Sequence, residues 1–168
     1  PIKKIDKEVL ELAKDLREIL QVGDKRLESV CEPIKKIDKE VLELAKDLRD
    51  TLYNCDGVGL AAPQIGVLKK AILINLRNGS DEILLFNPKI IKQSGSEKDY
   101  EGCLSYVMHE GEVVRPTSVT VEGMTIEGQR VRYEAKGFLA RAFCHEIDHL
   151  DGIMYMSKAE AMYELVEE

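Results

Sequence analysis

The pentapeptide HEIDH, at residues 145–149, constrains this chain more than any other stretch of its sequence. His145 and His149 are four positions apart, and on an α-helix residues at that spacing share one face, so both imidazoles can reach one metal ion. Glu146 is then placed to take a proton from water at that ion. The pattern therefore predicts a helix over about residues 138–150 that carries two ligands and a base.

Two histidines do not by themselves make a catalytic metal centre, which usually has three protein ligands and one position for water. An alternative is that both histidines lie on the surface and pair with charged neighbours such as Asp148. The metzincin pattern HExxHxxGxxH fails, because Tyr155 stands where its third histidine would be. The candidates for a third ligand are Glu101, Cys103 and His109 upstream, and Asp151, Glu160 and Glu164 downstream.

The composition predicts one soluble domain. A chain of 168 residues with 44% hydrophobic and 33% charged residues is long enough for a hydrophobic core. Its net charge of -7 argues against general binding to nucleic acid. No apolar run has the length of a membrane span and no leader resembles a signal peptide, so we expect a cytoplasmic location without a membrane partner.

The four cysteines form no CxxC pair, so a disulfide framework is not expected. Cys31, Cys55 and Cys144 are interpreted as small buried apolar side chains. Cys103 is set apart because it is a candidate for the third metal ligand.

Residues 1–17, PIKKIDKEVLELAKDLR, recur without a change at 33–49. Two copies are too few for a solenoid, and each copy has the apolar stripe of an amphipathic helix. Asp38 is placed to cap the second helix. A short connection leads from this helix to the motif that contains Gln64, so we expect the second copy to occupy the native helix position. The first copy is expected to dock elsewhere, to exchange between chains or to stay loosely ordered. In the second copy the stripe consists of Val41, Ala45, Leu48 and Leu52.

The middle of the chain is typical of strands. Residues 69–76 and 82–91 are two apolar runs separated by a turn, and residues 111–137 alternate apolar and polar side chains as antiparallel strands do. Residues 94–105 are interpreted as a polar connection, and Ser157 as the cap of a short final helix. Strands in the middle with helices near both ends predict an α+β fold.

Three short motifs follow one another along the chain: GVGLAAPQ at 57–64, EGCLS at 101–105 and HEIDH at 145–149. They resemble, in the same order, the three motifs of bacterial peptide deformylases, and the likeness covers about residues 18–157. The resemblance implies antiparallel sheets packed around a central HExxH helix. It also implies a catalytic domain at 18–168, with the duplicated segment 1–17 as an addition in front.

The resemblance further implies the site residues and the reaction. Cys103, His145 and His149 would bind one divalent metal: ferrous iron in the cell, and zinc, nickel or cobalt in a purified sample. The implied reaction removes the N-formyl group from the N-terminal methionine of newly made polypeptides. The other implied roles are Glu146 as general base, Gln64 and the Leu104 N–H as oxyanion donors, and Val58 and Gly59 along the substrate.

Some residues depart from the family pattern and leave alternatives open. Cys144 stands where the family usually has glutamine. The run after EGCLS is Tyr106-Val107-Met108, where the family commonly has an aromatic or aliphatic residue and then proline. The alternatives are an amide hydrolase with altered substrate choice, a weakly active duplicated variant and a general zinc peptidase. We also expect Glu101 and Arg115 to pair behind the ligands, and His109 to lie at the edge of the groove.

The expected partner is the nascent formyl-methionyl polypeptide. The tail YELVEE is short and acidic, so we expect no ribosome contact through a basic C-terminal helix. The protein is expected to be a monomer, with a dimer that exchanges the repeat as the alternative.

Overall fold

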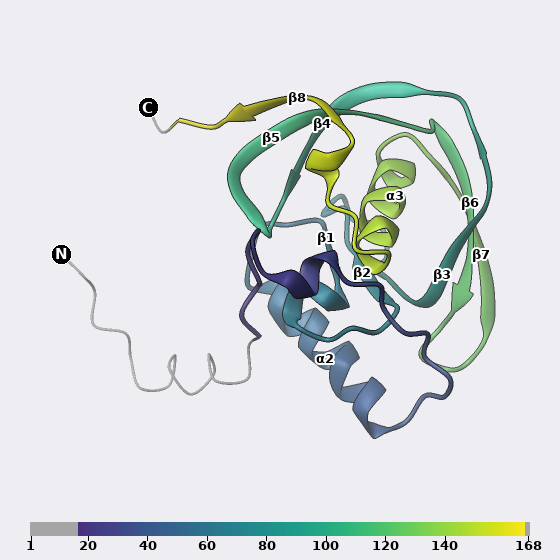
Figure 1. Ribbon diagram of the computed structural model, residues 1–168. Helices are drawn as coiled ribbons and strands as arrows, with labels where there is room; N and C mark the ends of the chain where they lie inside the picture. Colours follow the sequence, from purple (N-terminus) through teal and green to yellow (C-terminus); the bar gives the residue numbers. More distant parts are fainter. Residues whose placement is uncertain (1–16, 167–168) are drawn as a thin grey trace.

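The computed structural model describes residues 17–166 (Figure 1). Within that range the chain forms two α-helices, two antiparallel sheets and three short 3-10 helices, which confirms the α+β prediction. No helix in this range is both long enough and apolar enough to cross a membrane. The helices are α2 (Lys39–Tyr53), α3 (Phe138–Leu150), η1 (Lys25–Glu28), η2 (Ala62–Ile65) and η3 (Tyr155–Ser157).

The larger sheet has five strands in the order β1-β2-β3-β6-β7, and every neighbouring pair is antiparallel. The smaller sheet has three strands in the order β4-β5-β8, also antiparallel. The larger sheet comprises β1 (Gly59–Ala61), β2 (Ala71–Ile74), β3 (Ile83–Ser94), β6 (Ser118–Met124) and β7 (Arg130–Lys136). The smaller sheet comprises β4 (Glu97–Cys103), β5 (Tyr106–Arg115) and β8 (Ala159–Glu164).

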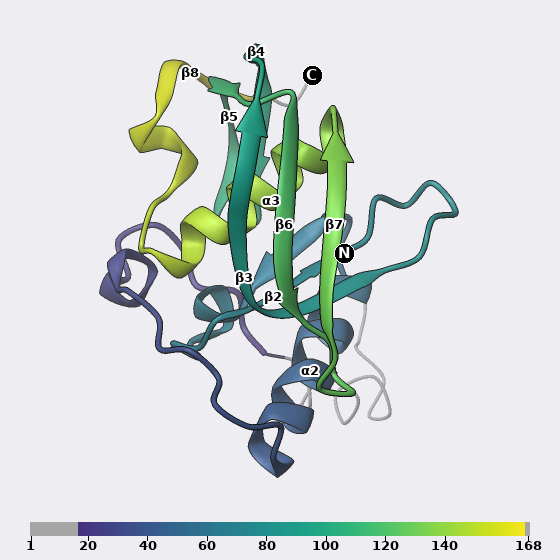
Figure 2. The ribbon, with the colours of Figure 1, turned by 90° about the vertical axis from the view of Figure 1, so that its right-hand side faces the viewer.

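Helix α3 lies in the middle of the molecule, with strands on either side of it (Figure 1). In the view of Figure 2, β3, β6 and β7 run side by side in front of the helix. Phe143 and Leu150 of α3 share a buried cluster with Leu85 of β3 and Val121 of β6. The helix that carries HEIDH is therefore held rigidly by apolar packing, and it begins and ends where the sequence predicts.

The second copy of the repeat forms α2, as the sequence predicts. Asp38 caps the helix by accepting a hydrogen bond from the Val41 N–H. The predicted stripe is buried, and Leu48 and Leu52 lie in a core cluster with Leu73 of β2. The prediction for the first copy concerns residues 1–17, and all of these except Arg17 lie outside the described residues.

Two sequence predictions about the smaller sheet are wrong. Residues 94–105 are not a connection, because residues 97–103 form β4 and pair with β5. Ser157 caps no final helix, since residues 159–164 form β8 on the other side of β5. The side chains of both segments are largely exposed, and those of β4 are mostly polar, so their pairing depends on the backbone of β5 and not on an apolar pattern.

Candidate metal centre and active site

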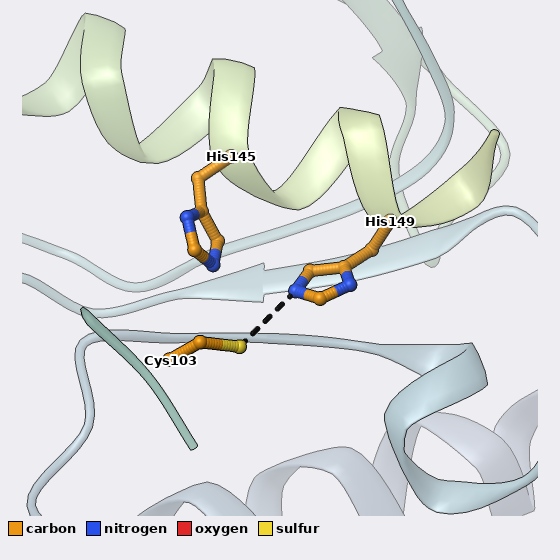
Figure 3. Close-up of side chains that lie close together, drawn as sticks. All are labelled: Cys103, His145 and His149. Carbon is orange, nitrogen blue, oxygen red and sulfur yellow. Dashed lines mark hydrogen bonds between the residues drawn. The ribbon is translucent and has the colours of Figure 1, made fainter. Parts of the chain in front are cut away.

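The structure brings the three predicted ligands together. Cys103 ends β4, while His145 and His149 are one turn apart on α3. One ligand atom from each of the three lies within 4.8 Å of the others, and the Cys103 Sγ is 3.4 Å from the His149 Nε2. Figure 3 shows the three side chains pointing into one gap between the helix and the strand. The cluster therefore has the shape of a three-ligand metal site.

The chemistry of this donor set fits one divalent cation. The His145 Nδ1 is 2.8 Å from the Glu101 Oε1, and a carboxylate only accepts, so the proton is on Nδ1 and Nε2 is left for a metal. Burial holds the pKa of His149 well below its ordinary value, so this ring is neutral, as a ligand must be. Burial also opposes the charged form of His145, but hydrogen bonds to Cys103 and Glu101 raise its pKa well above the ordinary value. Such surroundings stabilise positive charge where the metal would bind.

Glu101 links the ligands to the rest of the domain. Arg115 donates two hydrogen bonds of 2.9 Å to its carboxylate, as the sequence predicts, and Arg141 donates a third of 2.7 Å. Burial alone would raise the pKa of Glu101, but His145 and Arg115 outweigh it and hold the pKa far below the usual range. Glu101 is therefore an anion that orients the His145 ring. The sequence analysis did not identify Arg141. The available signal was an arginine on the apolar side of α3, where a charged side chain needs a buried partner.

Glu146 has the surroundings of a general base. Its side chain is buried, and its Oε1 finds no hydrogen-bond partner among residues 17–166. Burial raises the pKa of this carboxyl to about 7, close to the value that suits proton transfer at neutral pH. Gly59 lies directly against it, because a Cβ at that position would overlap the Glu146 Oε2. The unpaired oxygen is therefore available to a substrate or a water molecule.

Gln64 is held beside the cluster by its own hydrogen bonds. Its Oε1 accepts from the Ala61 N–H at 2.9 Å, so its Nε2 is directed toward the site. The Nε2 donates to the Ser105 Oγ at 3.0 Å and is 3.5 Å from the Cys103 Sγ. Ser105 was missed as a functional residue in the sequence, where it stands only as the last letter of EGCLS.

A cavity of about 740 Å³ opens over the cluster. It brings together most of the residues that the sequence assigns to the site, while His149 is buried behind it. His109 is absent from the metal cluster and stacks on Tyr106, with ring centroids 3.9 Å apart. The predicted residues that line the cavity are Val58, Gly59, Gln64, Cys103, Leu104, His145 and Glu146.

The polypeptide deformylase family model matches residues 16–164, which is most of the chain. The chain belongs to the polypeptide deformylase family. Deformylases remove the N-formyl group from newly made polypeptides, and this protein is a metal-dependent enzyme of that kind.

Similar sequences and solved structures support the same family assignment. Peptide deformylase 2 of Clostridium perfringens is 49% identical over 153 residues, which cover 90% of this chain and 98% of the relative. The crystal structure of a peptide deformylase from Legionella pneumophila has a TM-score of 0.83 at 35% identity and covers 86% of each chain. The Thermotoga maritima peptide deformylase has a TM-score of 0.82 at 31% identity, covering 87% of this chain and 99% of that chain.

Proposed function

We propose that Cys103, His145 and His149 hold one divalent metal, which is ferrous iron in the cell. Their converging donor atoms and the orientation of His145 by Glu101 support this assignment. When bound, the ion would act as a Lewis acid that polarises the formyl oxygen and lowers the pKa of water. Zinc, nickel or cobalt would occupy the same ligands in a purified sample, because thiolate and imidazole also suit these metals.

Glu146 is the general base of the proposed mechanism. Its unpaired Oε1 and its pKa of about 7 support proton transfer at neutral pH. The carboxylate takes a proton from the attacking water as the oxygen–carbon bond to the formyl group forms. It then gives this proton to the amine nitrogen as the carbon–nitrogen bond breaks. The products are formate and a free N-terminal methionine.

Gln64 and the Leu104 N–H stabilise the negative charge that develops on the formyl oxygen. The fixed orientation of the Gln64 amide supports this role, because donors that need no rearrangement stabilise a transition state most effectively. Val58 and Gly59 lie along the substrate. The position of Gly59 against Glu146 leaves no room for a side chain there.

The proposed substrate in the cell is the nascent formyl-methionyl polypeptide, and the proposed location is the cytoplasm. The four free thiols within the described part of the chain support a reducing compartment. We place the catalytic domain at residues 18–168, with 1–17 as an added segment, which agrees with a family match that begins at residue 16. The proposed state is a monomer, and exchange of the repeat between two chains is the alternative.

Formate release tests the proposed roles. The substrate is a formyl-Met-Ala-Ser peptide, assayed without oxygen with iron-, nickel- and zinc-loaded protein, and an acetylated peptide tests for altered substrate choice. Turnover of the formyl peptide with iron or nickel, and its loss by about 10²-fold or more in Glu146→Ala, is the expected result. The metal content of Glu146→Ala should equal that of the wild type. Undiminished turnover in this variant would exclude Glu146 as the base.

A further inference from the structure

Residues 20–22 bridge the two segments that carry the proposed oxyanion donors. The Leu20 N–H donates to the Gln64 carbonyl in η2 at 2.8 Å. The Val22 N–H donates to the Ser105 carbonyl, in the turn between β4 and β5, at 2.9 Å. We call residues 20–22 the N-terminal strap, and Figure 1 shows this purple part of the chain beside the ends of β4 and β5. The strap therefore joins two parts of the site that are 41 positions apart in the sequence.

Gln21, the middle residue of the N-terminal strap, adds a side-chain contact. Its Nε2 donates to the Leu104 carbonyl at 3.0 Å and to the Ile19 carbonyl at 3.2 Å. Because one amide group bonds both the turn and the chain just before the strap, it holds the two together. The Leu104 N–H, a proposed oxyanion donor, belongs to that turn. Gln21 does not line the cavity, so it can act on the reaction only through the residues that it holds.

The N-terminal strap closes a ring of contacts around the donors. On the inner side, the Gln64 Nε2 donates to the Ser105 Oγ at 3.0 Å, and both residues are buried. On the outer side, the strap bonds the backbone carbonyls of the same two residues. One side-chain hydrogen bond leaves two backbones free to turn about it, whereas a second connection removes that freedom. The strap therefore helps to set the position of the Gln64 amide relative to the Leu104 N–H.

Both ends of the N-terminal strap are anchored in the fold. Before it, Ile19 packs against the core cluster beneath α2, and after it Leu27 of η1 is fully buried. A tight turn leads from the strap to η1, because the Asp24 N–H donates to the Gln21 carbonyl at 3.1 Å. Gly23 has a φ of 106° in this turn, a conformation that glycine adopts without strain. Fixed ends allow the strap to resist displacement of the segments that it holds.

We propose that the N-terminal strap, with Gln21 as a positioning residue, holds the two oxyanion donors in place for catalysis. This proposal rests on the proposed function, because it takes Gln64 and the Leu104 N–H to stabilise the negative charge on the formyl oxygen. Donors stabilise a transition state most when they are fixed before the reaction, and an error of about 1 Å can lower the rate about 10²-fold. Loss of the strap contacts then lowers kcat and leaves the metal ligands unchanged.

The substitution Gln21→Met tests the side-chain contact. Methionine is uncharged and of similar length, but it cannot donate to the Leu104 carbonyl. In the formate-release assay with formyl-Met-Ala-Ser, kcat should fall about three-fold, because the lost interaction acts on the transition state. The KM, and the metal affinity measured by competition with a chelator, should equal the wild-type values. Gln129→Met is the matched control and should keep the wild-type kcat, because Gln129 is exposed in the turn between β6 and β7.

The substitution Val22→Pro tests a backbone contact. It removes the N–H that donates to the Ser105 carbonyl. Proline suits this position, because Val22 is the second residue of the tight turn and Gly23, the third, has a positive φ. Val22→Ala is the comparison, since alanine changes the side chain but keeps the N–H. The kcat of Val22→Pro should be about five-fold lower than that of Val22→Ala, with equal metal affinity.

A double variant separates positioning from a general structural role. Gln64→Ala removes one of the two donors, so the N-terminal strap no longer has a pair of groups to place relative to each other. In the Gln64→Ala protein, the added substitution Gln21→Met should therefore lower kcat by less than about 1.5-fold. General loosening of the domain would lower kcat by the same factor in both proteins.

Three results would overturn the proposal: a wild-type kcat in Gln21→Met, equal kcat values in Val22→Pro and Val22→Ala, or the same effect of Gln21→Met with and without Gln64. A wild-type kcat in Gln64→Ala alone would instead refute the proposed oxyanion role of Gln64, and the proposal for the strap would fall with it. The single variant Gln64→Ala therefore distinguishes a failure of the proposed function from a failure of the strap.

Discussion

Two parallel hydrogen bonds of 2.9 Å join the guanidinium of Arg115 to the carboxylate of Glu101, and both side chains are almost fully buried. A paired arrangement of this kind fixes the plane of the carboxylate as well as its position. The Glu101 Oε1 that accepts from Arg115 also faces the His145 Nδ1. Arg115 therefore determines the orientation of a proposed metal ligand that it does not touch.

Replacement of Arg115 by alanine should weaken both the fold and the metal site. It leaves Glu101 as a buried carboxylate with fewer partners, which costs about 3–5 kcal/mol in the free energy of unfolding. Metal affinity should fall about 10- to 100-fold, because the orientation of His145 is lost. Urea unfolding of the metal-free protein and a competition titration with a chelator measure the two effects.

Arg132→Ala is the matched control for that experiment. Arg132 forms an ion pair with Glu122, but its side chain is 61% exposed, so its removal should cost less than about 1 kcal/mol. Full metal affinity in Arg115→Ala would show that the Glu101–Arg115 pair does not orient the ligand.

The substitution Gly59→Ala should lower kcat without removing the metal. The new Cβ would be 2.9 Å from the Glu146 Cδ, so the general base must shift. Displacement of a base by about 1 Å can lower the rate about 10²-fold. Formate release gives kcat and metal analysis gives the occupancy. A variant with wild-type kcat would show that Glu146 tolerates the methyl group and that its position in the structure is not the catalytic one.

Ser105→Ala should lower kcat by about 3- to 10-fold with little change in KM. The substitution removes the buried hydroxyl that accepts from the Gln64 Nε2 at 3.0 Å, so the oxyanion donor loses part of its fixed orientation. A hydrogen bond of this kind contributes about 0.5–1.5 kcal/mol. Ser157→Ala is the control, because its hydroxyl also makes one hydrogen bond, to the Met154 carbonyl, and does not line the cavity. Equal kinetics for the two variants would contradict the prediction.

Cys31 should make the protein less stable at alkaline pH. Burial raises the pKa of its thiol from the ordinary value of 9.0 to about 11 in the folded state. Between these values the unfolded chain has released the proton that the folded chain retains, so the free energy of unfolding falls as pH rises. The loss is on the order of 1–3 kcal/mol by pH 11.

Unfolding by urea at pH 8 and pH 10.5 measures that loss, with Cys31→Ala as the comparison. The alanine variant should be less stable at pH 8, since it removes buried volume, but its stability should fall less between the two pH values. The same fall in both proteins would show that other groups titrate.

The sequence carried enough local information for much of the fold. The spacing of HEIDH and the apolar residues around it predicted α3, since a helix aligns residues four apart regardless of what surrounds it. The stripe from Val41 to Leu52, with its cap at Asp38, predicted α2 for the same reason. Alternation of apolar and polar residues predicted β6 and β7, because one face of each strand packs on the core.

The smaller sheet could not be predicted in this way. The side chains of β4 are mostly polar and exposed, and those of β8 are mostly exposed, so no alternation of buried apolar and exposed polar residues marks them as strands. Their backbone partners are on β5, and that pairing is a property of the folded chain.

The sequence by itself determined which chemical groups the site contains. It supplied the thiol, the two imidazoles, the base and the amide, together with the helical spacing of His145 and His149. Only the tertiary structure brought Cys103 to within 3.4 Å of a histidine 46 positions away, and placed Glu101 and Arg115 behind them. The reason is physical: contacts within one helix turn follow from backbone geometry, whereas contacts between β4 and α3 require the core between the two sheets to form.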